Sequence, residues 1–177
     1  MSDPQPGSHQ HPHRRASPVR VATWILTVSD TRTLETDTGG ARVAELLGAA
    51  GHGVAGREIV PDDASAIAAA LRAALRRDGV EAVILTGGTG VAPRDVTPEA
   101  VLPLLERVVP GFGELFRLLS YQEIGSAAML SRALAGLAAG RVVFVLPGSR
   151  GAVQLGMEKL VLPEIGHLLG EARKARP

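Results

Sequence analysis

The sequence of 177 residues contains no cysteine, which excludes disulfide bonds, thiolate metal sites and a cysteine nucleophile. Aromatic residues make up only 3% of the chain, so a nucleic-acid surface built on base stacking is not expected. The formal net charge is +1 and no long run of lysine or arginine occurs, which argues against DNA or RNA as a partner. No apolar run approaches the roughly 20 residues of a membrane span, and the N-terminus has no hydrophobic signal core. We therefore expect a cytoplasmic protein that binds neither nucleic acid nor membrane.

The first 18 residues differ in composition from the rest of the chain. They are rich in proline, histidine, serine and arginine and have almost no apolar side chains. Such a segment cannot bury surface, so we predict a disordered polar tail over residues 1–18. His9, His11 and His13 are spaced two residues apart there, with a solvated tail as one interpretation and a metal site as the alternative. Residues 19–177 are expected to form a single domain, being long enough for a sizeable core.

Short apolar runs alternate with helical patterns after the tail. Strands are predicted over 21–28, 54–60, 80–85 and 141–146, and helices over 38–50, 64–77, 98–108 and 152–172, the last interrupted at Pro163. Residues 111–139 are expected to be mostly helical, with a break at Gly125. Strands that are apolar on both faces and alternate with helices indicate an α/β fold, in which helices cover both sides of a mostly parallel sheet.

Each predicted strand ends in residues that suit a ligand. The carboxyl ends of parallel strands share one edge of a sheet, where open α/β folds bind their ligands. We therefore expect the residues that follow the strands to surround one binding site. They are Ser29 and Asp30; Asp62 and Asp63; Thr86, Gly87, Gly88, Thr89, Gly90, Arg94 and Asp95; and Pro147, Gly148 and Ser149.

The glycine loop, residues 86–90, is the most informative of these segments. Glycines let backbone N–H groups approach a ligand closely, which suits phosphates and other anions. The loop is not a Walker A motif, because no Gly-Lys-Ser/Thr follows, and the third glycine of a dinucleotide fingerprint would fall on Pro93. A tight connection between strand and helix is the alternative interpretation. In either case, Thr97 is predicted to cap the next helix, with Pro98 at its first position.

Two carboxylates at neighbouring strand ends can hold Mg²⁺, which commonly takes one or two carboxylates together with phosphate oxygens and water. Asp62 and Asp95 are the candidates, whereas Asp63 is also explained as the N-cap of a helix. Arg94 offers a forked donor to phosphate, with a surface ion pair as the alternative. Ser149 suits either a helix N-cap or an anion site. No Ser–His–Asp arrangement is evident, so hydrolysis through a histidine base is not expected.

Four segments resemble the MoaB/MogA family of molybdenum-cofactor biosynthesis proteins, and two of them are closer to its MoaB branch. They are VSDTRTLETDTGG (28–40), TGGTGVAPRDVTPEA (86–100), PGFGELFRLLSYQEIGSAAMLSRALAG (110–136) and LPGS (146–149). The resemblance implies a three-layer α/β/α sandwich of the molybdopterin-binding-domain type. It also implies assembly into a homo-trimer or, in the MoaB branch, a homo-hexamer.

The same resemblance implies a reaction. Molybdopterin and Mg-ATP would bind, and adenylylation of molybdopterin would release pyrophosphate. Asp62 and Asp95 match the family's two acidic residues, of which one helps to hold Mg²⁺ and the other is needed for transfer. Residues 86–90 match the loop that binds pterin and phosphate. Ser29, Asp30, Pro147, Gly148 and Ser149 match other walls of the site, and Arg150 stands where the family usually has proline.

Three other functions are consistent with these residues. The first is a non-catalytic molybdopterin-binding protein of the same fold. The second is a general nucleotide- or sugar-phosphate-binding module, and the third is a structural oligomer with a vestigial site. The apolar segment 112–134 is predicted to bury part of its surface against another subunit, with a purely internal core role as the alternative.

Overall fold

The computed structural model describes residues 19–174, so the predicted tail over 1–18 and its histidines lie outside the described residues. One six-stranded sheet has the order β2-β1-β3-β6-β5-β4. Strands β1, β2, β3 and β6 are parallel, and β5 is antiparallel to both of its neighbours. The bounds are β1 Ala22–Val28, β2 Gly53–Val60, β3 Ala82–Thr86, β4 Arg107–Val108, β5 Leu134–Ala138 and β6 Arg141–Leu146.

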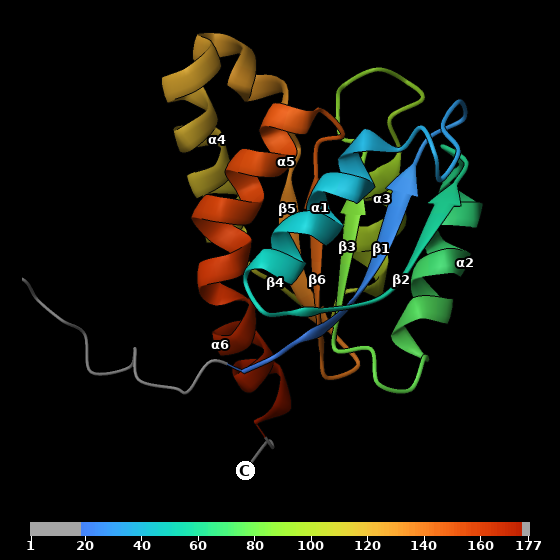
Figure 1. The fold of residues 1–177 in the computed structure, drawn as a ribbon. Helices are drawn as coiled ribbons and strands as arrows, with labels where there is room; N and C mark the ends of the chain where they lie inside the picture. Colours follow the sequence, from blue (N-terminus) through green and yellow to red (C-terminus); the bar gives the residue numbers. More distant parts are fainter. Residues whose placement is uncertain (1–18, 175–177) are drawn as a thin grey trace, which may run out of the picture.

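Helices cover both faces of the sheet, as predicted (Figure 1). One face carries α1 (Thr38–Ala49), α4 (Pro110–Ile124), α5 (Arg150–Gly156) and α6 (Leu162–Arg173). The other carries α2 (Ala64–Leu75) and α3 (Thr97–Val101). The predicted three-layer α/β/α arrangement is therefore confirmed. Within residues 19–174 no helix is both long and apolar enough to cross a membrane.

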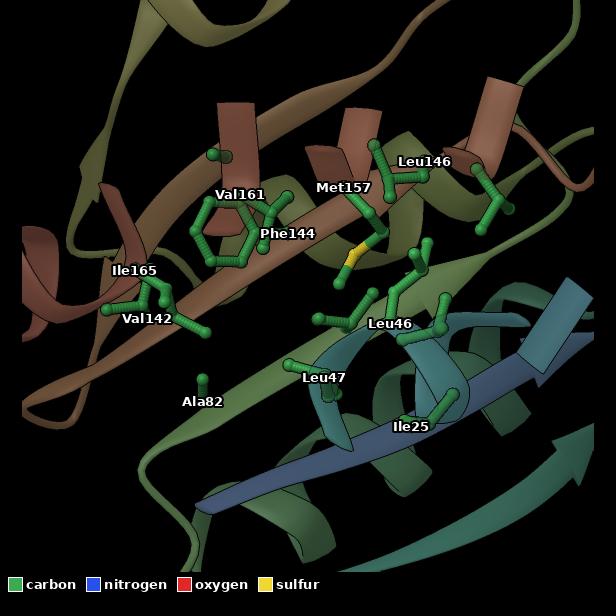
Figure 2. Packing of buried hydrophobic residues seen from close by; sticks show 14 of the residues in the cluster. Ile25, Leu46, Leu47, Ala82, Val142, Phe144, Leu146, Met157, Val161 and Ile165 are labelled. Carbon is green, nitrogen blue, oxygen red and sulfur yellow. The ribbon is translucent and has the colours of Figure 1, made fainter. Parts of the chain in front are cut away.

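The central strands place apolar side chains on both faces, which is why helices must cover both. Ile25 and Phe144 belong to the cluster under α1 and the C-terminal helices, whereas their neighbours Leu26 and Val145 belong to the cluster under α2. Figure 2 shows Met157 beside Phe144 and Leu146, in the layer between sheet and helices. Removal of this apolar surface from water is the main force that holds the three layers together.

The helix predicted over 98–108 is wrong beyond its first turn. The α-helix ends at Val101, a 3₁₀ turn follows at Leu102–Leu104, and β4 begins at Arg107. Pro103 lies in this turn, and a proline inside an α-helix removes a backbone hydrogen bond and clashes with the preceding turn. The apolar residues after Val101 continue the helical pattern in the sequence, although the backbone is no longer α-helical there.

The prediction for residues 111–139, mostly helical with a break at Gly125, is correct as far as Leu130, because a 3₁₀ helix over Gly125–Leu130 follows α4. Helix α4 ends at Ile124, and its C-cap Gly125, with a φ of +64°, supplies the predicted break, but Leu134–Ala138 forms β5 instead of helix. Ala139 and Gly140, both with positive φ, turn the chain into β6. A Cβ on Gly136 would lie 2.6 Å from the carbonyl oxygen of Arg107, so only glycine lets β4 approach β5 this closely. Leucine and alanine are not strand-forming residues, so the sequence pattern alone predicts helix there.

The predicted interruption of the last helix is present, but it lies just before Pro163 and not at it. A π-helical turn over Met157–Val161 separates α5 from α6, and Pro163 stands at the start of α6. Proline has no N–H with which to continue the α-helical ladder, and the single π turn lies directly before the turn that contains it.

His52, in the turn after α1, provides a test of the fold. Its Nδ1 accepts a hydrogen bond from the backbone N–H of Val21 at 3.2 Å, and burial lowers the pKa of His52. As the pH falls through the ordinary histidine pKa of about 6.5, the unfolded state therefore binds a proton at His52 more readily than the folded state does. The contribution of neutral His52 to the free energy of unfolding is therefore complete above that pH and is lost below it.

We expect His52→Gln to show a smaller loss of unfolding free energy than the wild type between about pH 8 and about pH 5.5. Urea unfolding at both pH values measures this, with His167→Gln, at an exposed histidine of α6, as the control. An unchanged pH dependence in His52→Gln would contradict the assignment.

Candidate functional site

The carboxyl ends of β1, β2, β3 and β6 lie at one edge of the sheet, as the sequence predicted. We call the residues that follow these ends the strand-end site. The backbone N–H of Asp62 donates to Oδ1 of Asp30 at 3.0 Å, and the N–H of Ser29 donates to the carbonyl of Val60 at 2.8 Å. The first two strand ends are therefore joined directly.

The glycine loop packs against β1 and α3 so closely that side chains are excluded. Gly87 and Gly88 have φ values of +99° and +61°. A Cβ on Gly87 would collide with the carbonyl oxygen of Val28. A Cβ on Gly88 would collide with the hydroxyl of Thr97 and lie 2.9 Å from Oδ1 of Asp62. Both the conformation and the space therefore require glycine, and Asp62 lies directly beside the loop.

Thr97 has a different role from the predicted helix cap. Val96 occupies the N-cap position of α3 and Thr97 is the first helical residue, with Pro98 second. The hydroxyl of Thr97 donates to the carbonyl of Gly87 at 2.9 Å. The backbone N–H of Thr97 also donates to the carbonyl of Gly88 at 3.1 Å, so this threonine fixes the glycine loop through two hydrogen bonds.

Asp95 lies beneath the second half of the loop. A Cβ on Gly90 would be 2.7 Å from Oδ2 of Asp95, and that oxygen accepts a hydrogen bond from the backbone N–H of Ala92 at 3.1 Å. Arg94 precedes it as an exposed residue. The short glycine thus makes room for a half-buried carboxylate at the strand-end site.

The carboxylate of Asp62 is only partly compensated by hydrogen bonds. Its Oδ1 is buried and has no hydrogen-bond partner among residues 19–174. Burial raises the pKa of Asp62, the backbone N–H of Val96 opposes this change, and the carboxylates of Asp95 and Asp30 add to it. A buried acceptor beside two further carboxylates gains from a cation, so these residues fit Mg²⁺.

The described residues hold no cluster of three or more acidic or histidine side chains arranged to bind a metal. A magnesium ion at Asp62 and Asp95 would therefore need its remaining ligands from phosphate oxygens and water, as this ion commonly does.

Three of the predicted site residues make local capping bonds. Asp63 accepts from the N–H of Ala66 at 2.9 Å and caps α2, which confirms the capping alternative. Ser149 accepts from the N–H of Ala152 at 3.3 Å and caps α5. Ser29 accepts from two backbone N–H groups in the turn after β1. These side chains shape the strand ends whether or not they also contact a ligand.

Asp37 was missed by sequence reasoning. Its side chain is buried and caps α1 through the N–H of Gly40 at 2.8 Å. It also accepts from the hydroxyl of Thr27 at 2.9 Å and pairs with Arg57 at 2.7 Å. An aspartate just before a predicted helix is a recognisable N-cap signal, whereas nothing local in the sequence indicates Arg57 as its partner.

Arg132 was also missed. It precedes β5, yet its Nε donates to the carbonyl of Gly90 at 2.8 Å, across 42 residues of sequence. No local pattern marks such a long-range contact.

A cavity of about 520 Å³ lies beside α3, β4, α4 and β5, and Arg132 is among the residues that line it. The apolar side chains of the segment 112–134, which is predicted to contact another subunit, are of two kinds, buried and exposed. Phe116 is buried in the core, which fits the alternative interpretation for that residue. The other set, which we call the α4 face, is at least 50% exposed: Leu115, Leu118, Tyr121, Ile124, Met129 and Leu130.

Comparison with known proteins agrees with this architecture. The family described as "Probable molybdopterin binding domain" matches residues 24–167. The chain belongs to this family of molybdenum-cofactor biosynthesis proteins. Molybdenum cofactor biosynthesis protein B of Halalkalibacterium halodurans is 51% identical over 165 residues, which cover 93% of this chain and 97% of that protein.

Two crystal structures extend the comparison. A molybdenum cofactor biosynthesis protein B has a TM-score of 0.87 at 51% identity, covering 90% of this chain and 100% of the other. The tungsten cofactor synthesizing protein MoaB of Pyrococcus furiosus has a TM-score of 0.80 at 37% identity, covering 89% and 100%. The resemblance to the MoaB branch is thus confirmed.

Substitution of Gly88 tests the packing of the glycine loop. We expect Gly88→Ala to lose about 1–3 kcal/mol of unfolding free energy, because the new Cβ is strained at positive φ and collides with Thr97. Gly48→Ala is the matched control, since a Cβ there meets nothing within 4 Å in helix α1 and should gain about 0.5–1 kcal/mol. Denaturant unfolding measures both, and a Gly88→Ala variant as stable as wild type would contradict the close packing.

Proposed function

We propose that this protein binds molybdopterin and Mg-ATP at the strand-end site and adenylylates molybdopterin, releasing pyrophosphate. The observation that carries the proposal is the unpartnered buried oxygen of Asp62, beside both the glycine loop and the charge of Asp95. Such an acceptor suits a cation brought in with a nucleotide. Membership of the family supports molybdopterin as the second substrate.

The proposed reaction needs no nucleophilic side chain. An oxygen of the terminal phosphate of molybdopterin attacks the α-phosphorus of ATP. The new P–O bond forms as the bond from the α-phosphorus to the oxygen bridging to the β-phosphorus breaks, and pyrophosphate leaves. Because the attacking group is already an anion, the chain contributes positioning and neutralisation of charge.

The carboxylates and the arginine divide these tasks. We assign Asp62 as the main Mg²⁺ ligand because its Oδ1 is free, and Asp95 as the second carboxylate because its Oδ2 is already engaged by Ala92. Bound Mg²⁺ supplies neutralisation of the phosphate charge. Arg94, exposed next to Asp95, adds a forked donor to phosphate. The glycine loop, residues 86–90, admits the phosphates close to the backbone.

The remaining strand ends are assigned to the walls of the site. We assign Ser29 and Asp30 on one side, and Pro147, Gly148 and Ser149 on the other, to contacts with pterin or nucleotide. A non-catalytic molybdopterin-binding protein is the alternative function, because the same carboxylates and loop would serve binding without transfer.

A direct transfer assay tests the reaction. Purified protein with molybdopterin, ATP and Mg²⁺ should yield adenylylated product and pyrophosphate, and Asp62→Asn or Asp95→Asn should lower the rate by about 100-fold or more. Asp63→Asn is the matched control, because asparagine also caps helices and Asp63 caps α2. Wild-type protein that binds molybdopterin without forming product would favour the alternative, and an active Asp62→Asn variant would contradict the assigned site.

We further propose that the α4 face forms the contact between subunits of a homo-trimer or homo-hexamer. Leu115, Leu118, Tyr121 and Ile124 recur every three residues along α4, which Figure 1 shows at the outer end of the sheet. A contiguous exposed apolar stripe of this kind marks an interaction surface.

A charge in this stripe should prevent assembly. We expect Leu118→Glu to lower the mass measured by light scattering from that of a trimer or hexamer to that of a monomer, because an unpaired carboxylate would be buried at the contact. Leu34→Glu is the control, since that leucine is 54% exposed against 57% for Leu118 and lies outside the α4 face. Equal masses for both variants and the wild type would place the contact elsewhere.

A further inference from the structure

We infer that Arg132 is a positioning residue for the transfer reaction and that it acts by holding the segment 90–95, here called the Asp95 loop. The inference rests on the proposed function, since Asp95 has a task there. Arg132 acts through the backbone of the loop rather than through contact with substrate.

One side chain fastens both ends of the Asp95 loop. Nε of Arg132 donates to the carbonyl of Gly90 at 2.8 Å, and a terminal N–H of the guanidinium donates to the carbonyl of Asp95. Another terminal N–H pairs with the carboxylate of Glu99, in the first turn of α3. The backbone N–H of Arg132 also donates to the carbonyl of Thr89 at 3.2 Å. The guanidinium thus ties the loop and α3 to the segment before β5.

The rest of the loop has little else to fix it. Residues 91–94 are exposed, and the internal bonds join Asp95 and Ala92 only, through the backbone at 2.9 Å and through Oδ2 at 3.1 Å. These bonds close a turn but do not place that turn relative to the sheet. The contacts of Arg132 supply that placement.

The position of the Asp95 carboxylate depends on both ends of the loop. Oδ2 of Asp95 lies against Gly90, where a Cβ would come within 2.7 Å. A shift of either Gly90 or the Asp95 backbone therefore moves the carboxylate, and Arg132 bonds to both. A misplacement of about 1 Å in a reacting constellation can reduce a rate by about 100-fold.

Arginine is specifically suited to this task. Its planar guanidinium carries donors in a fixed fork that reaches two carbonyls and a carboxylate together, whereas the ammonium of lysine is a single flexible point charge. Lysine at position 132 would retain the charge opposite Glu99 but lose the simultaneous contacts to Gly90 and Asp95.

The kinetic test uses the full-length chain with molybdopterin, ATP and Mg²⁺. We expect Arg132→Lys to lower kcat by about tenfold and Arg132→Ala by about 100-fold, with KM for ATP changed by less than about threefold. Glu99→Gln is the matched control, because it removes the ion pair and leaves both carbonyl contacts, so its kcat should stay within about twofold of wild type. An unchanged kcat in both Arg132 variants would overturn the positioning role.

Hydrogen exchange of the same variants without substrates separates this inference from the proposed function. We expect faster amide exchange over residues 89–95 in the Arg132 variants, with β1 and β3 unchanged. Unchanged exchange in the Asp95 loop would overturn the clamp, and faster exchange throughout the chain would show general destabilisation instead of positioning. A wild-type protein that forms no product would overturn the proposed function and the kinetic role together, while exchange still decides whether Arg132 holds the loop.

Discussion

The strand-end site depends on close contacts between backbones, where a side chain on any of several glycines would force its neighbours to move. A Cβ on Gly148 would lie 3.2 Å from Cα of Gly87, and a Cβ on Gly39 would lie 3.3 Å from the carbonyl oxygen of Gly148. Gly87 itself presses against Val28 and donates its N–H to the carbonyl of Leu146 at 3.0 Å. The ends of β1, β3 and β6 and the start of α1 therefore meet as bare backbone. This arrangement leaves an edge where charged ligands can approach main-chain groups and where the few nearby side chains, chiefly carboxylates, determine the chemistry.

The balance of charge distinguishes a structural aspartate at this edge from one suited to a ligand. Asp37 is buried, yet its oxygens are fully engaged by Gly40, Thr27 and Arg57, so its charge is compensated within the chain. Asp62 has a buried oxygen with no partner among residues 19–174, and its neighbours Asp30 and Asp95 repel further negative charge. A buried polar atom without a partner is destabilising, so Asp62, unlike Asp37, is a carboxylate that the proposed Mg²⁺ would stabilise.

The sequence predicted the parts of the fold that local patterns determine. Runs that are apolar on both faces identified the parallel strands, and polar or glycine residues directly after them identified Asp62, the glycine loop and Ser149 as neighbours in space. The antiparallel edge of the sheet was not predicted, because β5 consists of leucine, alanine and glycine, which do not favour strands. Its pairing with β4 depends instead on the small size of Gly136. Arg132 and Arg57 were missed for a related reason, since each meets its partners across at least 20 residues of sequence. Such contacts arise from tertiary packing, which a single sequence does not reveal.

Arg150 shows how a departure from the family pattern can agree with the proposed chemistry. It is the first residue of α5, where the family usually has proline, and the cap by Ser149 fixes the start of the helix without that proline. A positive charge at a helix N-terminus opposes the helix dipole and costs about 0.3–1 kcal/mol. The carboxyl of Glu45 in α1 is an acidic group near this arginine: Arg42 first, and Arg150 in addition, lower the pKa of that carboxyl. A phosphate bound at the strand ends, as we propose, would be attracted by the guanidinium of Arg150. The arginine therefore opposes this helix start in the free protein, and it would favour the anionic substrates of the proposed reaction.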